Sequence, residues 1–241
     1  MKNTHYRTKH AASLAITVLV AFMLVACGSS GGETDLAAAD TSKSKVELSA
    51  ASTCPPPITV PGSRYSQVYK GCRLGTNVYY SKTECVKDNL TGLTWQGQTP
   101  AGVGLRANDQ IKTNYDSTAG TQNYNGGNPI HATQAQIDAP TNAIGFKNAV
   151  NLTNLCGSSA WRLPTHTELL GLVKSTESPT IDNAWFPNTG SMYYWTSTPD
   201  QNYSYFAWAV SFAKVFATNN TVSVNLGRSN TINQLVRLVH N

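Results

Sequence analysis

Charged residues are scarce in this chain of 241 residues, at 13%, and there are only five histidines. Beyond residue 26 the histidines are His131, His166 and His240, and no two of them stand at the spacing of metal ligands. No G-x-S-x-G, H-E-x-x-H or Gly-Lys-Ser phosphate loop occurs. We therefore expect a protein without a metal ion, without a cofactor and without catalytic residues.

An excess of positive charge is also missing from most of the chain. The formal net charge is +5, but residues 1–26 hold Lys2, Arg7 and Lys9, three of the 18 basic residues, and none of the 13 acidic ones. The remainder carries 15 minus 13, or +2. Proteins that bind nucleic acid usually show a strongly basic face or domain. We therefore expect no nucleic-acid partner.

Only one long apolar run is present, and it lies at residues 11–25 behind a basic N-terminus. It falls short of the ~20 residues that a membrane-spanning helix needs, so we interpret residues 1–26 as a signal peptide. The sequence Leu24-Val25-Ala26-Cys27 resembles the lipobox, which makes Cys27 the expected lipid attachment site. The alternative is an ordinary signal peptide with an unrelated cysteine nearby. Gly28, rather than Asp, follows the cysteine, and in lipoproteins that resemble those of enteric bacteria this implies an outer-membrane anchor, on the periplasmic face or the cell surface.

Four cysteines remain once Cys27 is set aside. An even number in an exported chain implies two disulfides, for which three connectivities are open. We favour Cys54 with Cys72, because that bond closes a Pro-rich loop and contributes ~3 kcal/mol on loop-entropy grounds. The other bond then joins Cys85 to Cys156 and ties the start of the main domain to the end of its first helix. A metal site is disfavoured because the chain has no C-x-x-C or paired Cys/His spacing.

Composition divides the mature chain into three parts. Residues 27–51 are rich in Ala, Ser, Thr, Asp and Lys and predict a flexible tether. Residues 52–82 predict a disulfide-stapled extension that is irregular until β structure begins near Val78. Residues 83–241 predict the main domain, and within it residues 96–140 show no periodicity, so they are a functional loop or partly disordered.

The main domain has the pattern of an α+β fold. Thr165 and Glu168 match the S/T-x-x-E capping box and predict a helix over 166–174. This motif accounts for Glu168, which disfavours an acid/base pair with His166. Apolar spacing predicts another helix over 141–155. The remaining segments predict a hairpin over 83–95 and strands at 193–198, 207–212, 222–226 and 235–239. The tryptophans in these segments are expected in the core, with Trp185 uncommitted: Trp95, Trp161, Trp195 and Trp208.

Several short motifs occur together in one order from Cys85 to the C-terminus. They are Asp88-Asn89-Leu90-Thr91-Gly92-Leu93-Thr94-Trp95, Leu155-Cys156-Gly157, Trp161-Arg162-Leu163-Pro164-Thr165, Ile181-Asp182, Phe186-Pro187, Tyr194-Trp195-Thr196-Ser197-Thr198, Ala207-Trp208-Ala209-Val210 and Val236-Arg237-Leu238-Val239. This region resembles the Lcl_C family, the C-terminal domain of collagen-like bacterial adhesins. The resemblance implies a C-type lectin-like fold, with two helices packed on a twisted antiparallel sheet. It also implies surface adhesion or ligand binding, in some members to sulfated polysaccharides.

The chain departs from this family at two places. Many relatives have a cysteine where this chain has Leu238, and that cysteine would pair with the counterpart of Cys156. Cys85 is then the most economical partner for Cys156. Relatives also tend to have glycine after the strand that holds Trp208, where this chain has Ala213-Lys214, so the hairpin geometry there is open. The carboxylates of a calcium-dependent sugar site are absent from Thr198-Pro199-Asp200, which disfavours calcium.

The C-terminal region is rich in polar and aromatic residues of the kind that line antibody binding sites. A related group with this fold is diversified there by retroelements, so a diversified binding surface is one hypothesis and an envelope structural or assembly component is another. The leading hypothesis is an adhesin-like lipoprotein that binds an extracellular glycan or protein. Asn and Tyr are also ordinary turn and strand residues, which is the competing interpretation. The expected ligand-binding residues are Asn202, Tyr203, Tyr205, Asn219, Asn220, Arg228, Asn230 and Asn233.

Overall fold

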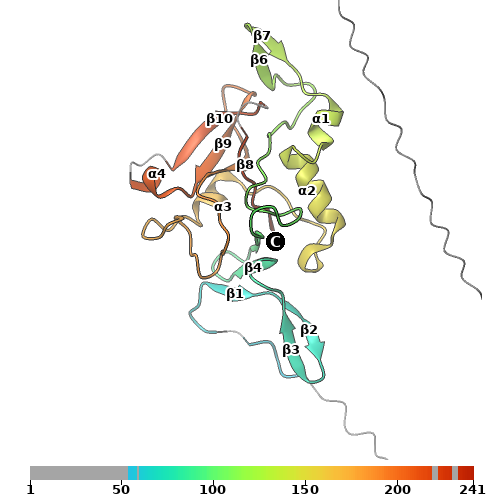
Figure 1. Cartoon of the computed structure of the whole chain (residues 1–241), viewed down its shortest axis with the longest axis vertical. Helices are drawn as coiled ribbons and strands as arrows, with labels where there is room; N and C mark the ends of the chain where they lie inside the picture. Colours follow the sequence, from blue (N-terminus) through green and yellow to red (C-terminus); the bar gives the residue numbers. More distant parts are fainter. Residues whose placement is uncertain (1–53, 59, 219–221, 230–232) are drawn as a thin grey trace, which may run out of the picture. The chain divides into compact units, whose positions relative to one another are not determined.

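The computed structural model describes residues 54–58, 60–218, 222–229 and 233–241 (Figure 1). The predicted signal peptide, Cys27 and the tether lie outside these residues, as do Asn219, Asn220 and Asn230. No helix in the described ranges is long and apolar enough to cross a membrane.

One antiparallel sheet joins the two ends of the described chain. Its strand order is β1 (Tyr65–Gln67), β4 (Cys85–Asp88), β5 (Thr94–Gln96) and β11 (Val239–His240). The hairpin predicted over 83–95 is confirmed, since β4 and β5 pair antiparallel. The extension therefore adds an edge strand, β1, to the sheet of the main domain.

A second antiparallel sheet has the order β10 (Ser223–Gly227), β9 (Phe206–Ser211) and β8 (Tyr193–Pro199). These three strands confirm three of the four predicted C-terminal strands. The fourth prediction, 235–239, holds only at its end, because Leu235 forms an isolated bridge to Tyr194 before the chain enters β11. A short helix, α4 (Lys214–Thr218), connects β9 to β10 where the hairpin geometry was open.

Three further helices and a 3-10 turn cover the sheets. They are α1 (Gln134–Asp138), α2 (Ala143–Leu152), η1 (Leu155–Gly157) and α3 (His166–Leu170). The capping box of α3 is confirmed: the Thr165 hydroxyl accepts from the Glu168 amide at 3.3 Å, and the Glu168 carboxylate accepts from the Thr165 amide at 2.8 Å. Arg162 donates to both carboxylate oxygens of Glu168, at 2.8 and 2.7 Å. The helix ends at Leu170, four residues earlier than predicted.

The extension was predicted to be irregular until Val78, and residues 96–140 were predicted to be a functional loop or partly disordered, but both segments contain hairpins. The extension forms the hairpin β2 (Tyr69–Arg73) and β3 (Thr76–Tyr79), and residues 96–140 contain the hairpin β6 (Asn123–Asn125) and β7 (Asn128–Ile130) as well as α1. The buried Asn142 side chain holds this long segment in place. It accepts from the Tyr115 amide at 2.8 Å and donates to the carbonyls of Tyr115 and Ile137 at 2.9 and 2.8 Å. A side-chain amide thus supplies partners that a strand ladder would otherwise provide.

Aromatic side chains fill the core, with one exception to the prediction. Trp95, Trp161 and Trp195 are fully buried, as expected. Trp208 is only half-buried, and its indole lies against His166 with ring centroids 4.8 Å apart, so its prediction as a core residue was wrong. Strand alternation explains the error, because Ala207 and Ala209 of the same strand point inward.

Both disulfides have the favoured pairing. Cys54 joins Cys72 and Cys85 joins Cys156, with Cα atoms 6.0 and 6.5 Å apart. Leu238 is fully buried in the same apolar cluster as Cys85. The architecture is mixed α+β with mostly β structure, as the sequence predicted at that level.

Candidate ligand-binding surface

The loop between β8 and β9 is organised by a single carboxylate. Oδ1 of Asp200 accepts from the amides of Asn202 and Tyr203 at 2.8 and 3.0 Å, an Asx turn. Its Oδ2 accepts from the side-chain amide of Asn225 on β10 at 2.6 Å. These bonds fix the loop on the sheet edge and leave the Asn202 side chain exposed.

Three tyrosine rings lie together at this loop, two from the loop itself and one from β6, and we name them the tyrosine cluster: Tyr124, Tyr203 and Tyr205. The ring of Tyr205 lies 4.8 Å from that of Tyr124, edge to face, and 5.5 Å from that of Tyr203. Tyr124 is 45% exposed and Tyr203 is 53% exposed. Figure 1 shows the β6–β7 hairpin, which carries Tyr124, at the same end of the domain as the β9–β10 sheet. Exposed tyrosines on fixed backbone offer contact area at a low cost in conformational entropy.

Arg228 is placed differently from its prediction as a surface contact. It is 2% exposed, and its Nε donates to the Ser204 carbonyl at 3.0 Å. Nη1 donates to the Asn114 carbonyl at 2.8 Å and lies 2.7 Å from the Asp116 carboxylate. Burial lowers the pKa of this guanidinium. Arg228 therefore ties the loop with two of the tyrosines to residues 114–116.

Arg228 also forms part of the wall of a pocket of about 460 Å³, which we name the basic pocket. Lys147 on α2 and Arg162 line it together with Arg228, and Asp116 is the one carboxylate among the lining residues that the structure describes. Glu168, which does not line the pocket, forms an ion pair with Arg162, and the hydrogen bonds between them raise the pKa of Arg162. Lys147 has no hydrogen-bond or ion-pair partner within the described ranges. Lys147 is therefore the positively charged side chain of this pocket that is available to bind an anion.

The outer face of the β8–β10 sheet carries a second hollow, of about 530 Å³, lined in part by Asp200, Asn202 and Trp208. Nearby, Nε2 of His166 lies 2.8 Å from the Ser223 hydroxyl, and burial lowers the pKa of His166. A serine and an imidazole at this distance form one part of a nucleophilic site, which also needs a third group that orients the imidazole. In this structure the imidazole ring of His166 packs against the indole ring of Trp208.

The expected ligand-binding residues are thus only partly brought together. Asn202, Tyr203 and Tyr205 share one loop, Arg228 is buried beneath it, and Asn233 is half-buried elsewhere near the C-terminus. Tyr124, Lys147 and Arg162 were not predicted. The turn Asn125-Gly126-Gly127-Asn128 is a hairpin signal that could have placed Tyr124 on a strand. No cluster of three His, Cys, Asp or Glu side chains that could hold a metal occurs in the residues the structure describes.

Fold and surface together define a disulfide-stapled α+β domain with a polar and aromatic face. The model of the Lcl_C family, described as the Lcl C-terminal domain, matches residues 84–240. The chain therefore belongs to the Lcl_C family, and that family's association with cell-surface adhesins supports an adhesin-like surface protein. No protein of curated function and no solved structure matches the chain.

Proposed function

We propose that this chain is a non-enzymatic lipoprotein of the outer membrane whose Lcl_C domain binds an extracellular sulfated polysaccharide. The basic pocket takes an anionic group, and the tyrosine cluster contacts neighbouring sugar rings. The C-type lectin-like architecture implied by the resemblance is part of this proposal. One observation carries it: Arg228 lines the basic pocket and also holds the loop of Tyr203 and Tyr205, so the charged and aromatic features adjoin.

The formal charges of the residues that line the basic pocket support an anionic ligand. Lys147, Arg162 and Arg228 contribute three positive charges against one negative charge from Asp116. Even with Glu168 counted, the local sum stays at +1, whereas the mature chain as a whole is only weakly basic. Salt screens the attraction between the positive charges of the pocket and an anionic ligand, because the Debye length is ~10 Å at 0.1 M. Binding is therefore expected to weaken as salt rises.

The test compares heparin with chemically desulfated heparin as ligands for the purified full chain. Lys147→Gln removes the unpaired cation, and a charge-assisted contact is worth ~1.5 kcal/mol or more, so heparin affinity should fall roughly tenfold. Lys70→Gln is the matched control, because it removes one charge from an exposed site on β2 outside the basic pocket. Equal affinity for the two polysaccharides, or equal losses in the two variants, would rule out the anionic ligand.

Attachment to the membrane has a separate test. Cys27 is the proposed acylation site, and metabolic labelling with palmitate should mark the wild-type protein. A Cys27→Ser variant should lose the label and leave the membrane fraction. Retention of the label in that variant would contradict the anchor without bearing on the ligand.

A further inference from the structure

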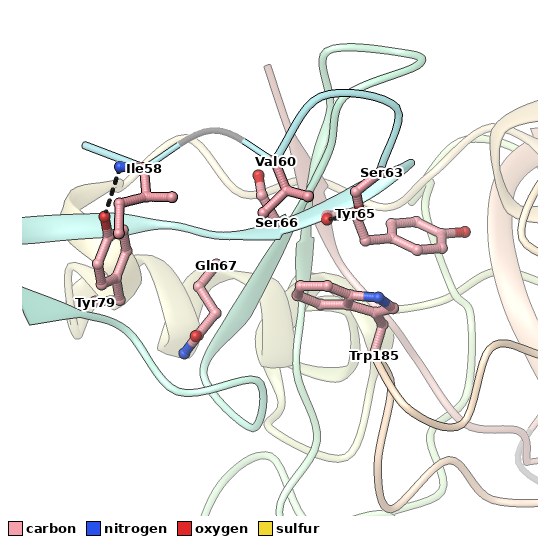
Figure 2. A pocket seen from close by; sticks show the side chains of 8 residues that line it. All are labelled: Ile58, Val60, Ser63, Tyr65, Ser66, Gln67, Tyr79 and Trp185. Atoms are coloured by element: carbon pink, nitrogen blue, oxygen red, sulfur yellow. Dashed lines mark hydrogen bonds between the residues drawn. The ribbon is translucent and has the colours of Figure 1, made fainter. Parts of the chain in front are cut away.

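A pocket of about 240 Å³ lies at the junction between the extension and the main domain. Seven of its eight lining residues precede residue 84, where the family match begins, and Trp185 is the eighth. The pocket is thus built mainly by residues outside the matched range. Figure 2 shows Trp185 and Tyr65 at one end and Ile58 and Tyr79 at the other.

The indole of Trp185 is held before any ligand arrives. The Lys82 ammonium stands 4.2 Å from the ring centroid and donates to the Ala184 carbonyl at 2.8 Å. Lys82 is not among the residues that line the pocket. The ring of Tyr65 lies 6.2 Å from the indole and packs edge-on against the buried Phe186 at 5.1 Å. A fixed aromatic wall lowers the entropy cost of binding.

The opposite end of the pocket is also held in place. The Tyr79 hydroxyl accepts from the Ile58 amide at 2.9 Å, as the dashed line in Figure 2 shows. Tyr79 belongs to β3, whose partner β2 contains Cys72, and the disulfide from Cys72 to Cys54 ties down the chain that leads to Ile58. The two aromatic ends are therefore fixed by separate constraints.

The chemistry of the lining selects an uncharged, amphipathic ligand. None of the described residues that line the pocket is Asp, Glu, His, Lys or Arg: besides its apolar and tyrosine side chains, it has Gln67 and two serines. One N–H of the Gln67 side-chain amide donates to the Tyr80 carbonyl at 3.0 Å, which leaves the second N–H as a donor and the side-chain oxygen as an acceptor. The Tyr79 hydroxyl, which already accepts from Ile58, still has its own proton to donate. An aromatic face that carries negative charge density attracts polarised C–H groups, while these polar atoms can bind hydroxyls.

The volume limits the size of the ligand. Pockets for drug-sized molecules measure ~300–1,000 Å³, so a pocket of about 240 Å³ accepts a single ring. We infer that the Trp185 pocket binds one uncharged pyranose ring of a glycan, stacked on the indole and hydrogen-bonded to Gln67 and Tyr79. This site differs from the basic pocket in its position and in the charge of its ligand, so it extends the proposed function without depending on it.

Tryptophan fluorescence of the full chain tests the inference directly. Methyl glycosides of neutral hexoses and N-acetylhexosamines are the probes, titrated at low and at high salt. We expect a saturable change in emission with at least one glycoside, equal at the two salt concentrations because the ligand is uncharged. The control variant Trp208→Phe removes a half-buried indole outside this pocket and should keep the response. A response lost in Trp208→Phe and kept in Trp185→Leu would overturn the assignment.

A second variant separates a sugar from an apolar group. Gln67→Leu keeps the size of the side chain but removes its acceptor, so glycoside affinity should fall at least tenfold and heparin affinity should not change. If Gln67→Leu instead binds glycosides as well as the wild type, or if only an apolar probe such as N-acetyltryptophanamide binds, the pocket takes an apolar side chain and the inference is wrong. The absence of any saturable response with the whole panel of glycosides would also refute it.

Discussion

A conservative exchange at Arg237 should destabilise the fold severely. This side chain is fully buried, and no carboxylate forms an ion pair with it in the described part of the chain. Its charge is satisfied by hydrogen bonds instead: Nη1 donates to the Gln96 carbonyl at 2.8 Å, and Nη2 donates at 2.8 Å to both the Gln98 side-chain oxygen and the Thr189 hydroxyl. Burial lowers the pKa of this guanidinium.

Arg237→Lys retains a positive charge and has three N–H donors, but all three are on one nitrogen in place of a planar fork. A single nitrogen cannot stand at both Nη positions, so one or two of the three hydrogen bonds are lost, each worth about 1.5–3 kcal/mol because the donor is charged. The free energy of unfolding should therefore fall by about 1.5–6 kcal/mol, out of the ~5–15 kcal/mol typical of a domain. Lys at this site also loses the stacking of the guanidinium over Phe186, whose ring centroid is 5.1 Å from it.

Urea unfolding followed by far-ultraviolet circular dichroism measures the loss as a lower midpoint at an unchanged slope. Arg73→Lys is the matched control, because Arg73 is exposed on β2 and the same exchange there should change stability by less than ~0.5 kcal/mol. A loss below ~1 kcal/mol at Arg237 would show that the three hydrogen bonds do not hold the core together. The arginine of the motif Val236-Arg237-Leu238-Val239 would then need another explanation.

Three further outcomes can be measured on the same protein. Tyr124→Ala should weaken heparin binding several-fold with little change in melting temperature, because the ring is exposed; an unchanged affinity would remove the tyrosine cluster from the site. The hydrogen bond from Arg162 lowers the pKa of Glu168, so its contribution to stability is present above the unfolded-state pKa of ~4.3 and is lost as pH falls through the folded-state pKa. Glu168→Gln should therefore show a smaller drop in melting temperature than the wild type on acidification, and equal drops would contradict that role. Replacing Cys85 and Cys156 by Ser should cost about 4 kcal/mol, because the bond closes a loop of 71 residues; a loss under ~1 kcal/mol would mean that the unfolded chain is already constrained.

Local signals in the sequence predicted the elements that depend on neighbouring residues. The capping box at Thr165 and Glu168 satisfies backbone groups within a single turn, so four residues suffice to specify the start of α3. Strands β8, β9 and β10 follow from runs of β-branched and aromatic residues between turns. The disulfide pairing followed from the cysteine count and from economy of connection.

The order of residues 96–140 depends on distant partners and could not be predicted in the same way. Asn142 fixes Tyr115 from 27 positions away, and Lys112 pairs with Gln234 in an isolated bridge. Neither contact leaves a periodic pattern in the sequence. Each depends on a single residue, whereas a periodic pattern arises when one whole face of a helix or strand is buried. The β6–β7 hairpin is different, since its Asn-Gly-Gly-Asn turn is a local signal.

The candidate site was predicted from amino-acid composition, and composition does not show whether a given side chain is buried or exposed. Asn202 and Tyr203 are exposed as expected, whereas Arg228, from the same polar region, is almost fully buried. A buried arginine that binds two carbonyls and a carboxylate cannot be told from a surface arginine by its neighbours in sequence. Lys147 reaches the site from α2, and the apolar spacing of that segment predicts a helix but gives no sign of a binding residue on it.

Lysine footprinting measures directly whether the basic pocket binds a sulfated polysaccharide. The full chain is acetylated with and without saturating heparin, and the modification of each lysine is measured by mass spectrometry. Heparin should protect Lys147 strongly and leave Lys70 unchanged, and desulfated heparin should protect neither. Equal acetylation of Lys147 with and without heparin, or protection confined to Lys70, would contradict binding at the basic pocket.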